Sequence, residues 1–333
     1  GAAPIYLDYN RGFFGVEISR ARLTIGDFFF IQSGVAIERS ASTPVDIVTG
    51  FGDFSLEAAG ALGPLISKGY VTPGKFSRIE NMPMQAITVG LSDAMLFVGA
   101  GPYFIDSNGD GKITPADTPS PDAVGLAVDN LDLALSIYTD PNKVVPRLWA
   151  MSATVDQVGF MGLDFLTLEA NQVRIAANQG SAWKGSTVKP YVDFVSTYGA
   201  GGLSVPTGGD PILLDYTSSL VGVYVGQATL KISEFVFVQG AFAFEKGQRQ
   251  RITVDTGASF GDIGFAANAA TLLASAPLTG AELSGDWKTL SNLEVETMTL
   301  GIKDANAFVG YGIPDFNSGT PIAQQDGVFG LGI

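Results

Sequence analysis

One twelve-residue segment of the sequence has the residue types and the spacing of a calcium site. The segment DSNGDGKITPAD runs from Asp106 to Asp117. Calcium prefers six to eight hard oxygen ligands, which alternate residues of a tightly turned loop present to its centre, and a glycine at position 6 allows the sharp bend. We therefore predict calcium as the cofactor of this chain. The predicted ligands are Asp106, Asn108, Asp110, the Lys112 carbonyl, Thr114 and Asp117.

The last position of this loop departs from the common EF-hand pattern. EF-hands place a bidentate Glu at position 12, where this sequence has the shorter Asp117. Over the loop alone, the sequence resembles dockerin modules of secreted bacterial proteins, but its flanks lack the helices and the second loop of a dockerin. An ordinary Asp/Asn/Gly turn without metal is the alternative. We expect calcium to stabilise this loop locally.

The residue types that are absent restrict the chemistry of the chain. It has no His and no Cys among its 333 residues, and 33 acidic against 19 basic residues give a net charge of −14. A Ser-His-Asp triad, a His-ligated metal, a thiolate nucleophile and a disulfide are therefore excluded within this chain. The acidic balance argues against nucleic acid as a partner. The sequence has no run of about 18 apolar residues, so it predicts no membrane-spanning helix. The N-terminal segment lacks the features of a signal peptide.

An acidic residue recurs along the chain between two segments of alternating apolar residues. The spacings of the five acids are 66, 71, 70 and 70 residues, which indicates duplicated units of about 70 residues. An acid between two strands commonly accepts hydrogen bonds from turn amides. We interpret the acids as structural, and a row of cation or glycan sites is the alternative. They are Asp27, Asp93, Asp164, Glu234 and Asp304.

A longer repeat contains the short one. The hexapeptide PIYLDY at 4–9 matches PILLDY at 211–216 with an offset of 207 residues. This offset predicts one long repeat at 1–207, made of three units, and a partial second repeat at 208–333. The segment IPDFNSGTPIAQQD, which corresponds to the calcium loop in the second repeat, lacks the ligand set. We expect the chain to be a window from a larger array.

The composition and the apolar periodicity predict an all-β protein. The sequence has 42 glycines, and period-two alternation over 16–25 and 235–244 predicts strands with one buried face. The segment 94–100 is apolar on both faces, which predicts a strand covered on both sides. Helical signals are confined to 53–67 and 265–276. The predicted architecture is an elongated stack of tandem β-units with few short helices, either solenoid-like or built of fused β-sandwiches.

Three tryptophans are candidates for a sugar-stacking surface. Trp183 and Trp287 are each followed by Lys in a predicted loop, and Trp149 is the third. Because tryptophans in a chain of this size commonly serve packing, we predict packing roles for them.

Most of the chain resembles the repeats of very large secreted bacterial proteins that are described loosely as adhesins or calcium-binding repeat proteins. The resemblance rests on alternating apolar strands, on "FVG" after an acid and on the inserted calcium loop, as in VGLSDAMLFVGAGPYFIDSNGDGKITPAD. It implies an extracellular or cell-surface location and a role in adhesion, matrix or filament formation. It brings no catalytic residues with it.

The predicted function is that of a structural or adhesive extracellular repeat protein. Such a protein acts through passive contacts that are spread over many units. The predicted partners are neighbouring repeats or further copies of the chain, and a glycan or surface ligand is a further candidate. We expect no enzymatic activity. A glycan-binding or carbohydrate-active module, which would need two carboxylates in a groove, is one alternative. An outer-membrane β-barrel, whose strands alternate over about ten residues, is another.

Overall fold

The computed structural model describes residues 12–53, 55–109, 117–256, 282–284 and 288–333. Most of these residues lie in β-strands, which confirms the predicted all-β class. The helices α1 and α2 confirm the helical signal at 53–67, whereas the signal at 265–276 lies outside the described residues. The helical elements are α1 (Leu56–Ala61), α2 (Gly63–Ser67), α3 (Phe194–Tyr198) and a 3-10 turn, η1 (Ile322–Gln324).

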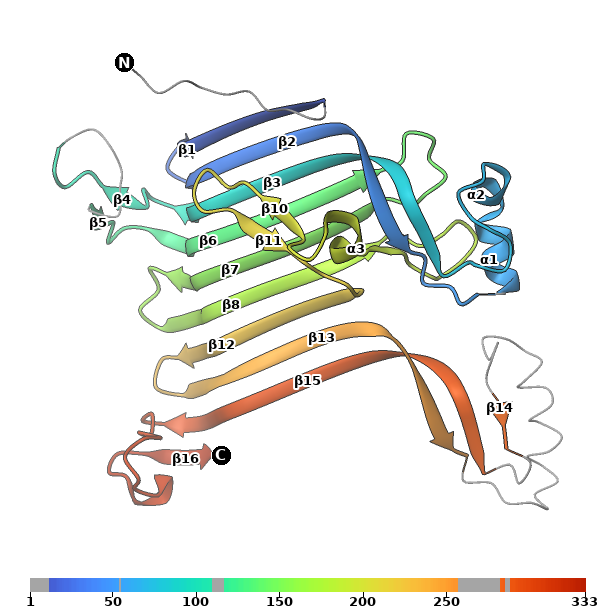
Figure 1. Cartoon of the computed structure of the whole chain (residues 1–333). Helices are drawn as coiled ribbons and strands as arrows, with labels where there is room; N and C mark the ends of the chain where they lie inside the picture. Colours follow the sequence, from blue (N-terminus) through green and yellow to red (C-terminus); the bar gives the residue numbers. More distant parts are fainter. Residues whose placement is uncertain (1–11, 54, 110–116, 257–281, 285–287) are drawn as a thin grey trace.

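A single antiparallel sheet of 12 strands runs through the molecule (Figure 1). Strands that follow one another in the sequence are mostly neighbours in the sheet, as expected for strands joined by short connections. The main path is β1 (Phe13–Ile25), β2 (Phe29–Val48), β3 (Arg78–Ala100), β6 (Val124–Thr139), β7 (Leu148–Met161), β8 (Leu166–Gly180), β12 (Leu220–Ile232), β13 (Val236–Asp255), β15 (Thr289–Tyr311) and β14 (Glu282–Leu283). Beside this path, β9 (Tyr191–Val192) pairs with β2 and β16 (Phe329–Gly332) pairs with β15.

Two of the five recurring acids do not separate strands. Asp27, Asp164 and Glu234 lie in the turns of the hairpins β1–β2, β7–β8 and β12–β13, as predicted. Asp93 and Asp304 instead lie inside the continuous strands β3 and β15, with φ of 48° and 51°. The prediction of two strands around these two acids is therefore wrong. Asp tolerates left-handed backbone better than most residues, and both a turn and a β-bulge use it.

A second layer covers one face of the sheet in its N-terminal part. It comprises α1, α2, α3 and the small hairpin of β10 (Leu203–Val205) and β11 (Ile212–Leu214). Figure 1 shows the hairpin and α3 in front of the middle strands, and α1 and α2 beside the strand ends. Apolar side chains of this layer, such as Leu62, Phe194 and Leu214, are fully buried against the sheet. Burial of this kind is the main force that stabilises the fold.

The cover does not extend over both faces of every strand. In the segment 94–100, Phe97 is buried in a small cluster with Phe30 and Met95. Val98, whose side chain points to the opposite face, is 45% exposed. The prediction of cover on both faces is therefore wrong at this position, because an apolar run shows only that both faces tolerate apolar residues.

The main sheet continues through the middle of the chain. Strand β12 pairs with β8 along its whole length, from Leu220 opposite Asn178 to Ile232 opposite Leu166. The predicted division between residues 207 and 208 falls in the covering layer, between the paired strands β10 and β11. The hydrogen-bond ladder thus joins the two predicted repeats in one sheet.

Candidate functional site

The predicted calcium loop projects from a short two-stranded ladder. Strands β4 (Phe104–Ile105) and β5 (Thr118–Pro119) pair so that Ile105 lies opposite Thr118. This pairing brings Asp106 and Asp117, the first and last predicted ligands, to the base of the loop. Asp117 is buried, with 5% exposure. The structure therefore supplies the closed loop base that the predicted site requires.

Hydrogen bonds at this base already use some of the carboxylate oxygens. The backbone N–H of Gly109 donates to Asp106 Oδ1 at 2.7 Å, and the N–H of Ser107 donates to Asp117 Oδ1 at 3.1 Å. Asn108 lies in the exposed turn between them. Asp110, Lys112 and Thr114 lie outside the described residues. In the described ranges alone, no cluster of three or more acidic, His or Cys side chains surrounds a common point, so the six-ligand set stays a prediction.

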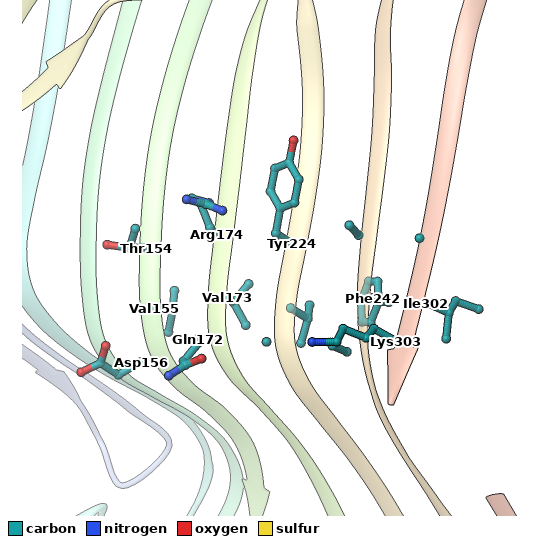
Figure 2. Close-up of a pocket in the computed structure, with 15 residues that line it drawn as sticks. Thr154, Val155, Asp156, Gln172, Val173, Arg174, Tyr224, Phe242, Ile302 and Lys303 are labelled. Carbon is teal, nitrogen blue, oxygen red and sulfur yellow. The ribbon is translucent and has the colours of Figure 1, made fainter. Parts of the chain in front are cut away.

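A cross-strand groove with a volume of about 620 Å³ lies on the sheet (Figure 2). It crosses β7, β8, β12, β13 and β15, and one row of directly opposed residues on these strands belongs to its lining. These residues are Val155, Val173, Val225, Phe242 and Ile302. Because successive residues of a strand point to opposite faces, the side chains of this row point away from the face that carries Arg174, Tyr224 and Gly301.

Polar side chains border this groove on two sides. Figure 2 shows Thr154, Arg174 and Tyr224 in one row across the strands, and Asp156 and Lys303 in a row on the other side of Val155 and Val173. Positive, negative and aromatic groups at the rim suit a polar chain with an extended shape. Asp156 is the one carboxylate that lines the groove in the described part of the chain.

Arg174 and Tyr224 form the best-defined contact at the rim. The Arg174 guanidinium lies 5.0 Å from the centre of the Tyr224 ring, a cation–π distance. The Tyr224 hydroxyl donates a hydrogen bond to Glu245. This bond, together with partial burial, raises the pKa of Tyr224 above its usual value. Tyr224 therefore stays a neutral hydrogen-bond donor.

A smaller groove of about 320 Å³ lies at the β1 side of the sheet. Its lining includes two carboxylates, Asp93 and Asp129, and the guanidinium-bearing Arg20. The backbone N–H of Asp93 donates a hydrogen bond to Asp132 Oδ1 on the neighbouring strand at 3.0 Å. Asn130, which has a left-handed backbone like Asp93, donates from Nδ2 to Asp156 Oδ2 at 2.8 Å. These contacts hold the bulged strands in place across the sheet.

Sequence reasoning predicted a calcium loop but predicted neither groove. Grooves form where bulges shift neighbouring strands, and a bulge leaves only a weak trace in one strand's sequence. The one trace of the bulges in the sequence is a polar residue at the left-handed position. Asn130 and Gln172 have φ of 50° and 54°, as Asp93 has 48°. Of the three tryptophans, Trp183 is buried, which confirms its predicted packing role; Trp287 lies outside the described residues.

Comparisons with known proteins give no relative for this chain. No protein family model matches the sequence, and no curated protein or solved structure is significantly similar to it. No helix in the described ranges is long and apolar enough to cross a membrane.

Proposed function

We propose that this chain is a structural or adhesive protein of the extracellular space or the cell surface, built from tandem β-units and stabilised locally by calcium. Assembly with neighbouring units or further copies, into a filament or matrix, belongs to this proposal. Arrays of this kind spread a modest binding or spacing role over many similar surfaces, so no single residue has to carry it.

The observation that carries the proposal is the shared register of two hairpins in one sheet. Strands β1 and β2 are joined by the turn 26–28 and shift register after Ile18; strands β12 and β13 are joined by the turn 233–235 and shift register after Val225. Ile18 and Val225 are 207 residues apart, which is the offset of the sequence repeat. A duplicated hairpin within a continuous sheet is what a tandem β-array requires.

The edges of the sheet support association with further strands. Strand β1 is the first strand of the sheet path, and Phe14 on it is 68% exposed. On the opposite side, Leu300 and Leu331 are 66% and 78% exposed on β15 and β16. Apolar residues on sheet edges are favourable sites for pairing with another chain.

Particle size and calcium dependence test the proposal together. We expect the purified chain to form extended or polymeric particles in light scattering and small-angle X-ray scattering. We also expect millimolar calcium to raise the melting temperature relative to chelator, since a ligand at 100 times its Kd stabilises the folded state by about 2.7 kcal/mol. Asp106→Ala should abolish the calcium response.

The matched control for Asp106→Ala is Asp315→Ala. Asp315 lies in the corresponding loop of the second predicted repeat and accepts a similar turn bond from the Asn317 N–H at 2.9 Å. This variant should keep the calcium response. A compact monomer without any calcium response would contradict the proposal, and would leave the loop as an ordinary turn.

Glycan binding is the second candidate function, and the groove beside β1 favours it. Asp93, Asp129 and Arg20 line this groove together, and carboxylates and guanidinium groups are suitable partners for sugar hydroxyls. A glycan array screened with wild type and with Asp129→Ala tests this candidate. Binding that the substitution weakens would support it, whereas the absence of any bound glycan would count against it.

A further inference from the structure

The segment Val205–Gly209 of the covering layer lies in direct backbone contact with the sheet. A Cβ added to Gly90 on β3 would lie 1.9 Å from the carbonyl oxygen of Pro206. A Cβ added to Gly208 would lie 2.4 Å from the carbonyl oxygen of Ile18 on β1. The Ser92 hydroxyl donates to the carbonyl of Thr207 at 3.3 Å. The sheet has small residues here because another backbone occupies the space that side chains would take.

The register of the sheet places the same pattern in the large groove over β13 and β15. On β2 and β3, Ala36 lies opposite Gly90 and Gly34 lies opposite Ser92. On β13 and β15, Ala243 lies opposite Gly301 and Ala241 lies opposite Lys303. The bulge residues Asp93 and Asp304 follow in both strands with matching φ. The groove residues that correspond to Ile18, Gly34, Ala36, Gly90 and Ser92 are thus, in this order, Val225, Ala241, Ala243, Gly301 and Lys303. All five line the groove.

The groove is open at Gly301, whereas the corresponding space above Gly90 is filled by Pro206. Gly301 is exposed, and a Cβ added to it would meet only the Cβ of Ala243, at 3.8 Å. Within the described molecule nothing therefore requires glycine at 301, whereas Pro206 requires it at 90. A backbone lying over Gly301, as Pro206 lies over Gly90, would explain the residue.

We propose that the groove over β13 and β15 binds a Pro-Thr-Gly-Gly segment that a neighbouring β-unit supplies and that resembles Val205–Gly209. This inference deepens the proposed function and rests on it, because it names the contact through which units would cover each other. Such a segment brings carbonyl oxygens to the groove. Lys303, which replaces Ser92, would donate to the carbonyl that corresponds to that of Thr207, and Arg174 would add a second donor at the rim.

The direct test is binding of a synthetic peptide to the full chain. The probe is the labelled peptide VPTGGDPILLDY, which reproduces residues 205–216, and fluorescence anisotropy measures its affinity. We expect saturable binding to wild type. Gly301→Val should weaken this binding about tenfold or more, because its side chain fills the space of the peptide backbone. A peptide with valine at both glycines should not bind, since Gly208 has a φ of +85° and leaves no room for a Cβ.

Thr299→Val is the matched control for Gly301→Val. Thr299 is exposed on the same strand two residues away, and it does not line the groove. Its counterpart Thr88 faces Tyr198 and Leu203, which the peptide does not contain. This variant should bind the peptide as wild type does, and both variants should keep the wild-type melting temperature.

Two results would overturn the inference: no saturable binding to wild type, or binding that Gly301→Val leaves unchanged. The second result would place the peptide elsewhere, for example in exchange with the chain's own covering segment. Peptide binding is measured at concentrations where the chain is unassembled. Its failure therefore leaves the particle-size and calcium results intact, and a failure of those tests leaves the peptide result intact.

Discussion

The covered and the open part of the sheet have similar strands but different surroundings. Around Gly90, the segment Val205–Gly209 and the helix α3 bury the sheet face, whereas the corresponding face around Gly301 is exposed in the described molecule. Strand length, register and bulges are nevertheless alike in both parts. The comparison indicates that local sequence and strand pairing set the shape of the sheet, and that the covering layer adds burial to a shape that exists without it.

The largest contrast is expected between a core side chain from the loop after β8 and a side chain on the open strands. Trp183 is 2% exposed, and its Nε1–H donates to the Thr49 carbonyl at 2.8 Å. Trp183→Ala should destabilise the fold by about 3–5 kcal/mol. Ile302 is 67% exposed, so Ile302→Ala should change stability by within about 0.5 kcal/mol. Chemical denaturation of both variants measures the difference, and equal effects would contradict the distinction between the two parts.

The paired glycines provide the next test. Gly90→Val should cost about 3 kcal/mol, because the new side chain collides with the backbone of Pro206 and overpacking is destabilising. Gly301→Val meets no close neighbour and should be neutral or slightly stabilising, since valine favours strands. Thermal unfolding of the two variants compares them directly. A large loss of stability in Gly301→Val would show that this position is already covered.

The bulges should respond alike in the two parts. Asp93→Val and Asp304→Val should each cost about 1–2 kcal/mol, because a branched L-residue is strained in left-handed backbone. Glycine at either position should be tolerated, because it adopts positive φ without steric cost. Urea denaturation of the four variants measures these effects. A cost confined to Asp93 would mean that the covering layer, and not the local backbone, imposes the bulge.

A smaller and pH-dependent contrast concerns ion pairs. Burial raises the pKa of Asp193, but hydrogen bonds from the Ser196 amide, Arg78 and the Ser196 hydroxyl outweigh it, so the pKa lies below its usual value. The carboxylate therefore stabilises the fold above its unfolded pKa of about 3.9, and this contribution is lost as the pH falls through the lower folded pKa. Arg78→Ala should move the midpoint of acid unfolding to higher pH.

The open part offers an exposed ion pair as the control. Lys246 Nζ lies 2.9 Å from Glu296 Oε2, and both side chains are about half exposed. Lys246→Ala should change stability by less than about 0.5 kcal/mol, since water and salt screen such pairs. If this variant shifted acid unfolding as much as Arg78→Ala, burial would not be the source of the difference.

Much of the fold follows from local patterns. Alternation over 16–25 and 235–244 predicts β1 and β13, and both are confirmed as strands. The predicted burial of one face is wrong for β1, because no described layer covers it and Val16, Ile18 and Leu23 are 47%, 44% and 53% exposed. The turns at Asp27, Asp164 and Glu234 were also predicted correctly. Asp93 and Asp304 were not, because a turn and a bulge both select a residue that tolerates left-handed backbone. Only the neighbouring strand, which pairs on both sides of the acid, distinguishes them.

The sequence by itself determined the all-β class, the offset of 207 residues and the composition of the predicted calcium loop, since these depend on residue types and spacing along the chain. Only the tertiary structure decided which glycines lie beneath a covering backbone. Gly90 and Gly301 have similar neighbours in sequence, and the difference between them comes from Pro206, which is more than 100 residues from Gly90. Contacts over such distances depend on how the sheet and its covering layer pack, because local preferences act only on near neighbours in the chain.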